Sequence, residues 1–192
     1  MPARTVYSLL EATAEKLGTA PALMQPVAGG RGRSYRRYDW IEFRDAVREL
    51  AVALAGAGLG KGDVVAIASE TRAELYLADF AIMARGAVSA VLYTSYNARE
   101  LVSTLRACSA RAVFAENRAV MERLLGAGAG ELGLKWFLLT EGGEAAATLE
   151  TLRRRGRAAL EKDPGLWPAL RDEVHPEDPA ILYLTSGATG EP

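Results

Sequence analysis

The feature that most constrains the fold is an alternation of short apolar runs with amphipathic stretches between residues 60 and 139. The mostly apolar runs 64–68, 87–93, 111–115 and 134–139 have the length of strands, and the segments between them repeat apolar residues at helical spacing. The run 64–68 is apolar throughout, which is typical of strands in parallel sheets buried on both faces, and right-handed helical crossovers connect the strands of such sheets. The pattern predicts an α/β fold with a mostly parallel sheet flanked by helices on both faces.

The N-terminal part predicts a small β-hairpin between two helices. Thr5 can cap a first amphipathic helix, and the segments 22–27 and 34–38 read as short strands joined by a glycine-rich turn. Asp39 and Glu42 have the spacing of a capping box, so a second helix is expected to begin directly after the hairpin.

Composition limits the function classes. The chain has 192 residues, of which 49% are hydrophobic and 24% charged, as in an ordinary folded domain. A formal net charge of -1 offers no general attraction to nucleic acid. Because no segment approaches the ~20 apolar residues of a membrane helix, and because Cys108 is the single cysteine, we expect a cytoplasmic protein without a transmembrane segment.

Four features invite functional readings that the residues around them do not favour. Glycines alternate over 126–130, but they follow a helix and precede a strand, so a linker is favoured over a nucleotide loop. The arginines of 153–157 lie in an acid-containing helical segment, which favours a solvated helix face. His175 has no cysteine or second histidine as a partner for a metal, and Cys108 is expected to be a buried thiol.

The last residues carry the strongest functional signal. An apolar run, 180–184, is followed by small hydroxyl and glycine residues that can donate backbone and side-chain hydrogen bonds to a phosphate. Ligands of parallel sheets bind at the carboxyl ends of strands, which also directs attention to 69–71 and 93–95. The spacing is not that of a Walker A loop, and a plain terminal turn remains the alternative.

Several segments resemble one family in the right order. Residues 182–192 resemble the Tyr-Thr-Ser-Gly-Thr-Thr-Gly-x-Pro-Lys-Gly phosphate loop of the AMP-forming acyl-CoA synthetases, members of the adenylate-forming superfamily. Residues 60–67 resemble the Gly-Asp-x-Val-Ala strand of the family, and 69–74 resemble its Ser-Glu-Asn-Arg-x-Glu segment. Together with 92–94, these segments look most like the long-chain fatty-acid–CoA ligase branch.

The resemblance implies a two-step reaction in which a fatty acid and Mg-ATP give acyl-AMP and pyrophosphate, after which coenzyme A displaces AMP. It also implies that the phosphates of ATP are held by the loop residues Thr185, Ser186, Gly187, Ala188, Thr189 and Gly190. Ala188 stands where the family usually has a second hydroxyl residue, which removes one possible donor to phosphate. The metal ligands stay unknown.

The same resemblance sets the expected extent of the chain. Residues 1–192 correspond to the N-terminal part of the large domain and end in the phosphate loop 185–192, before the C-terminal domain and the catalytic lysine of the family. We therefore expect no catalytic residue in this chain, no activity from it alone, and self-association through uncovered apolar surface. Two alternatives stay open: another adenylate-forming acid-activating ligase, or a non-enzymatic α/β module that binds a nucleotide or a protein.

Overall fold

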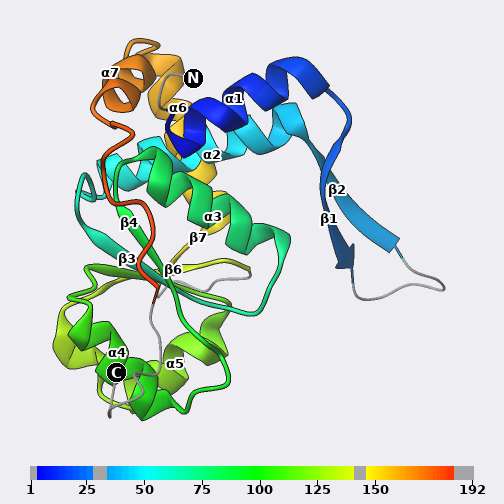
Figure 1. The fold of residues 1–192 in the computed structure, drawn as a ribbon. Helices are drawn as coiled ribbons and strands as arrows, with labels where there is room; N and C mark the ends of the chain where they lie inside the picture. The colour runs from blue at the N-terminus through cyan, green and yellow to red at the C-terminus, as the bar shows by residue number, and fades with distance from the viewer. Residues whose placement is uncertain (1–3, 28–33, 141–145, 184–192) are drawn as a thin grey trace.

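A parallel sheet of five strands forms the centre of the molecule (Figure 1). The computed structural model describes residues 4–27, 34–140 and 146–183. The strand order is β4-β3-β5-β6-β7, and all neighbouring strands are parallel. The strands are β3 (Val64–Ala68), β4 (Val88–Val91), β5 (Ala112–Ala115), β6 (Lys135–Leu138) and β7 (Ala147–Thr148). The predicted parallel sheet is confirmed.

Helices cover both faces of this sheet. Two helices, α2 (Trp40–Gly56) and α3 (Ala73–Ala84), lie on one face, and α4 (Ala98–Ala107) and α5 (Arg118–Gly126) lie on the other (Figure 1). Three more helices pack against α2 on its outer side: α1 (Val6–Leu17), α6 (Leu149–Lys162) and α7 (Leu166–Asp172). The flanked α/β architecture expected from the sequence is therefore present.

The core divides according to the alternation of side chains along each strand. Val65, Ile67 and Phe114 contribute to the cluster under α2 and α3, whereas Ala66 and Val113 contribute to the cluster under α4 and α5. All five side chains are fully buried. Because successive residues of a strand face opposite sides, strands that are apolar throughout supply both layers at once.

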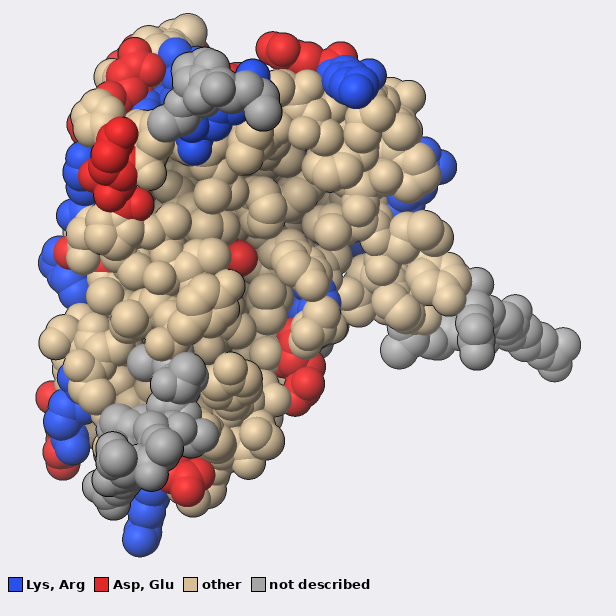
Figure 2. Space-filling view, viewed as in Figure 1, with Lys and Arg blue, Asp and Glu red and all other residues tan. Residues whose placement is uncertain are grey.

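The hairpin projects from the body of the molecule (Figures 1 and 2). Its strands β1 (Pro21–Val27) and β2 (Ser34–Asp39) pair antiparallel, as predicted. The capping box at the start of α2 is also confirmed, because Glu42 N donates to Asp39 Oδ1 at 2.8 Å and Asp39 N donates to Glu42 Oε2 at 3.0 Å. Local capping chemistry thus sets where the hairpin ends and the helix begins.

One expectation about an irregular segment is wrong. The glycine-rich stretch 126–130 is not a simple linker, because Gly128 adopts φ 103° and starts a short 3-10 turn, Ala129–Leu132, in which Ala129 is fully buried. The segment 163–168 contains prolines and a glycine, which indicate turns; residues 164–165 do form a turn, and α7 begins directly after it. Pro168 lies in the first turn of that helix, where a missing N–H removes no intrahelical hydrogen bond.

The arginine run 153–157 is solvated only in part, which corrects the expectation of a solvated face. Arg154 and Arg155 are exposed. Arg153 and Arg157 instead donate to the carboxylate of Glu49 on α2, at 2.9 and 2.7 Å. Because the buried carboxylate of Glu49 requires partners of opposite charge, Arg153 and Arg157 pair with it. Two of the four arginines therefore contribute to the packing of α6 against α2.

The edge of the sheet at β4 carries exposed apolar side chains. Val91 and Tyr93 at the end of β4, and Ile181 and Tyr183 on the segment beside it, are all exposed, Tyr183 to 78%. This is the kind of surface on which the expected self-association of the chain depends, and that expectation stays a prediction. Among the described residues, no helix is both long and apolar enough to cross a membrane.

Tyr7 on α1 packs inside the layer formed by α1, α2 and α7. Its ring meets that of Trp167 edge-on, with centroids 4.6 Å apart, and the residue is 3% exposed. Burial raises the pKa of Tyr7 from 10.0 to about 12. The phenol is therefore expected to resist ionisation in the folded protein at pH values where the unfolded chain already ionises it.

The Tyr7 hydroxyl is expected to make the protein sensitive to alkali. The pKa of Tyr7 is higher in the folded protein than in the unfolded chain. Its contribution to the free energy of unfolding is therefore fully present below pH 10 and is lost as the pH rises from 10.0 to about 12. A shift of about two pKa units corresponds to a loss of about 3 kcal/mol at most. Urea denaturation between pH 8 and about 12 should show a shallower alkaline decline for Tyr7→Phe than for the wild type. The exposed Tyr35→Phe serves as control; equal declines in all three proteins would refute the assignment.

Candidate ligand site at the carboxyl edge of the sheet

The segment that leads to the predicted phosphate loop lies beside β4. Ser89 N donates to Ala180 O at 2.9 Å, and Leu182 N donates to Ser89 O at 2.8 Å, so that Ile181 forms a parallel bridge with Ser89. The segment therefore runs in the same direction as the strands and towards their carboxyl ends. The predicted loop itself, 185–190, lies outside the described residues.

The approach to this bridge is anchored by two ion pairs. The Lys61 ammonium lies 2.8 Å from Asp178 Oδ2, and the same oxygen accepts from His175 N at 2.7 Å. The hydrogen bond from Lys61 lowers the pKa of Asp178 below its ordinary value. Arg85 pairs with Glu173 at 2.8 Å. His175 is exposed and contributes its backbone N–H to this arrangement.

The structure brings together two of the strand ends that the sequence pointed to. Thr94, after β4, donates its hydroxyl to the carboxylate of Glu70, after β3. Ser69 is buried beside them. Tyr93 packs its ring against that of Tyr96, with centroids 5.8 Å apart, and does not join this contact.

Glu116, which follows β5, is the residue that sequence reasoning missed. Its Oε2 accepts from Ser69 Oγ at 3.1 Å and from Glu70 N at 2.9 Å, and its Oε1 lies 3.5 Å from Arg72 Nη1. The rule that singled out the ends of β3 and β4 applies equally to β5, and a carboxylate directly after a buried strand was a usable signal. Its partners, 44 to 47 residues away, could not be read from spacing.

These strand ends surround a cavity of about 210 Å³. Carboxylates, hydroxyls and one guanidinium converge on it above an apolar floor, a combination typical of small-molecule sites. The lining residues are Ala68, Ser69, Glu70, Leu92, Thr94, Leu101, Glu116, Val120 and Arg123. Thr71 and Ser95 are not among the lining residues.

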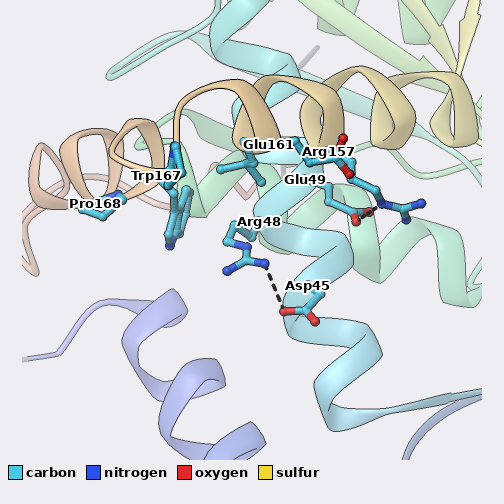
Figure 3. A pocket seen from close by; sticks show the side chains of 9 residues that line it. Asp45, Arg48, Glu49, Arg157, Glu161, Trp167 and Pro168 are labelled. Carbon is cyan, nitrogen blue, oxygen red and sulfur yellow. Dashed lines mark hydrogen bonds and ion pairs between the residues drawn. The ribbon is translucent and has the colours of Figure 1, made fainter.

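A larger groove of about 500 Å³ lies between α2, α6 and α7 (Figure 3). Several of its charged side chains are paired, Arg48 with Asp45 at 3.6 Å and Arg157 with Glu49 at 2.7 Å. No strand end contributes a residue to its lining. Because ligands of parallel sheets bind at strand ends, the smaller cavity is the better candidate.

The described residues contain no cluster of three or more His, Cys, Asp or Glu side chains suited to a metal ion. Cys108 is half-buried at the end of α4, and burial raises the pKa of its thiol. A thiol that ionises less readily is a poorer nucleophile, which agrees with a structural thiol, but the expected full burial is wrong, because Cys108 is only half-buried.

Comparison with known proteins adds independent evidence. A family model described as AMP-binding enzyme matches residues 10–192. The long-chain-fatty-acid–CoA ligase FadD15 of Mycobacterium bovis is 33% identical over 153 residues, 79% of this chain and 24% of that protein. The 4-chlorobenzoate–CoA ligase of an Arthrobacter species is 28% identical over 189 residues, 98% of this chain and 32% of that protein. The chain thus spans about a quarter to a third of the length of these relatives.

A solved structure shares the fold. The long-chain-fatty-acid-CoA ligase FadD1 from Archaeoglobus fulgidus superposes with a TM-score of 0.71 at 17% identity, over 97% of this chain and 35% of that one. At this identity the likeness shows the fold alone. The fold that surrounds the carboxyl-edge cavity is therefore one that a known ligase also uses.

Proposed function

We propose, since this chain belongs to the AMP-binding enzyme family, that it is the N-terminal part of an ATP-dependent, AMP-forming acid–CoA ligase. In this reaction a carboxylate attacks the α-phosphate of ATP, a P–O bond to pyrophosphate breaks, and acyl-AMP forms. The thiol of coenzyme A then displaces AMP to give the acyl-CoA. The single observation that carries the proposal is the match of the family model to residues 10–192.

The phosphates of ATP are assigned to the loop Thr185, Ser186, Gly187, Ala188, Thr189 and Gly190. Glycine N–H groups and hydroxyls are suited to a polyanion, because dense donors on a compact backbone can surround its oxygens. The assignment is supported by the direction of 180–182, which run parallel to β4 towards the carboxyl edge.

A bound Mg²⁺ would neutralise part of the phosphate charge in this reaction. We assign no ligand for it to the described residues, and the chemistry of 185–190 is that of donors to phosphate. The chain's own contribution is therefore to hold the phosphates and to shape the edge of the sheet beside them. A cytoplasmic location belongs to the same proposal.

We assign a long-chain fatty acid as the acid substrate, on the resemblance of 69–74 and 92–94 and on the 33% identity to FadD15. An aryl acid is the second candidate. It is favoured by the 28% identity to the 4-chlorobenzoate–CoA ligase, which extends over 98% of this chain.

The open reading frame that contains this chain, expressed as a whole, provides the test of activity. Acid-dependent exchange of pyrophosphate into ATP is measured with palmitate, 4-chlorobenzoate, acetate and no acid. We expect exchange to depend on the acid and to be fastest with palmitate. Faster pyrophosphate exchange with 4-chlorobenzoate would show that the acid substrate is an aryl acid. No exchange with any acid would contradict the proposed function.

Thr189→Val is expected to reduce kcat/KM for ATP about 10- to 100-fold, because a hydrogen bond to a charged phosphate is lost while side-chain volume is kept. Ala188→Thr, which restores the hydroxyl typical of the family, should lower the KM for ATP. The same exchange assay measures both, and Ser103→Ala on the exposed face of α4 serves as control. Unchanged kinetics in Thr189→Val would remove this residue from the phosphate site.

A further inference from the structure

The backbone of Glu116 continues the hydrogen-bond ladder of the sheet beyond the end of β5. Its backbone N–H donates to Ala68 O at 2.9 Å, and its carbonyl oxygen accepts from Thr140 N at 3.1 Å and from Thr140 Oγ1 at 2.8 Å. The residue is thereby tied to the ends of β3 and β6 on either side of β5. Because these hydrogen bonds fix the backbone of Glu116, they also limit where its carboxylate can lie.

Both carboxylate oxygens of Glu116 are engaged by the loop after β3. Ser69 Oγ and Glu70 N donate to one oxygen, at 3.1 and 2.9 Å, and Arg72 approaches the other at 3.5 Å. Arg72 is itself held by Glu74, with Nε 2.8 Å from a carboxylate oxygen. Hydrogen bonds to an ionised acceptor are stronger than neutral ones, so this contact orients the loop.

The effect of Glu116 extends to the next strand through Glu70. With its backbone fixed by Glu116, Glu70 presents its carboxylate to Thr94 at the end of β4. The path Glu116–Glu70–Thr94 thus joins the ends of β5, β3 and β4, and all three residues line the carboxyl-edge cavity. The segment that leads to the phosphate loop lies beside β4, against Ser89.

We infer that Glu116 is a positioning residue for the adenylation reaction: its carboxylate fixes Glu70, and through Glu70 the Thr94 end of β4, the strand whose Ser89 pairs with Ile181. The inference rests on the proposed function. Glu116 acts through other residues, and no contact with substrate is assigned to it. A displacement of about 1 Å at a reacting site costs about 100-fold in rate, so loss of this support has a measurable effect.

Three variants of the whole ligase test the inference by pyrophosphate exchange. Glu116→Ala removes all three acceptor contacts, and kcat/KM for ATP is expected to fall about 10- to 100-fold. Glu116→Gln keeps an oxygen for Ser69 and Glu70, and is expected to stay within about threefold of the wild type. Glu122→Ala, a glutamate in an exposed pair with Arg118 on α5, is the matched control and should be unchanged. Equal losses in Glu116→Ala and Glu116→Gln would overturn the inference.

A double-mutant cycle separates positioning from general destabilisation. If Glu116 acts through Glu70 on Thr94, then Glu116→Ala combined with Thr94→Val loses no more activity than the more impaired single variant. Multiplication of the two single losses would show that the residues act independently, and would overturn the proposed path.

Hydrogen exchange keeps this inference separable from the proposed function. In Glu116→Ala, amides of 69–72 are expected to exchange faster than in the wild type, while those of β5 and α3 are unchanged. If the amides of 69–72 in Glu116→Ala exchange hydrogen at the wild-type rate, the positioning role is overturned, even if the enzyme is active. If the wild type adenylates none of the acids, the proposed function fails together with the catalytic part of this inference. Hydrogen exchange of residues 69–72 still decides whether Glu116 holds the loop after β3.

Discussion

Replacing Gly156 by alanine is expected to lower the free energy of unfolding by about 3 kcal/mol or more, because no space for a methyl group exists where α6 crosses α2. A Cβ on Gly156 would lie 1.8 Å from the carbonyl oxygen and 2.6 Å from the carbonyl carbon of Glu49. Both atoms belong to helix backbone, which cannot rotate away as the end of a side chain could. The helices must therefore separate. Urea denaturation followed by circular dichroism measures the loss.

Gly126→Ala is the matched control for this substitution. Gly126 is the last residue of α5, and a Cβ built on it meets no atom within 4 Å. Alanine is preferred to glycine in helices by up to about 1 kcal/mol, so the control should be neutral or slightly stabilising. Similar stabilities for the Gly156 and Gly126 variants would show that α2 and α6 do not cross as closely as described.

Glu49→Ala is expected to cost about 3 kcal/mol, the second large effect, because it leaves a charge stranded between two helices. Glu49 is 6% exposed, and its oxygens accept from Arg157 at 2.7 Å and from Arg153 at 2.9 Å (Figure 3 shows Arg157). The Arg153 side chain is 13% exposed, so it would keep only the longer 3.7 Å contact with Glu150 and would regain little water. The free energy of unfolding in urea again gives the magnitude.

The two arginines provide an internal comparison. Arg157 is half-exposed and can be solvated when its contact is broken, so Arg157→Ala should cost less than about 1 kcal/mol. Arg153→Ala should cost more, because Arg153 also packs where α6 meets α2. If Glu49→Ala and Arg157→Ala lower the free energy of unfolding equally, the buried carboxylate of Glu49 does not dominate the contact between α2 and α6.

Much of the element order could be predicted because its causes are local. Asp39 and Glu42 start α2 through a capping box, and Asn97 and Glu100 start α4 in the same way. Each of these signals lies within four residues and depends on no distant contact. The run 64–68 matches β3 residue for residue, because an apolar run of that length has few other ways to be buried.

The expectations that the structure corrected depend on contacts between distant residues. The start of α7 was not expected, because prolines and a glycine in 163–168 indicate turns. The first turn of a helix tolerates Pro168, and the burial of Trp167 against Tyr7 favours helix there. Arg153 looked solvated, because its partner Glu49 is 104 residues away in the sequence. Pairings at such distances exist only once the chain has folded.

The sequence by itself determined that this chain forms a flanked parallel sheet, that the region of interest is the carboxyl edge, and that its segments resemble acid-activating ligases. Periodicity, capping and strand-end rules act over a few residues and can be read in order. Only the tertiary structure decided the strand order β4-β3-β5-β6-β7 and the joining of Glu116, Glu70 and Thr94. The reason is that strand neighbours and carboxylate partners are set by the path of the chain between distant residues, and no local pattern encodes that path.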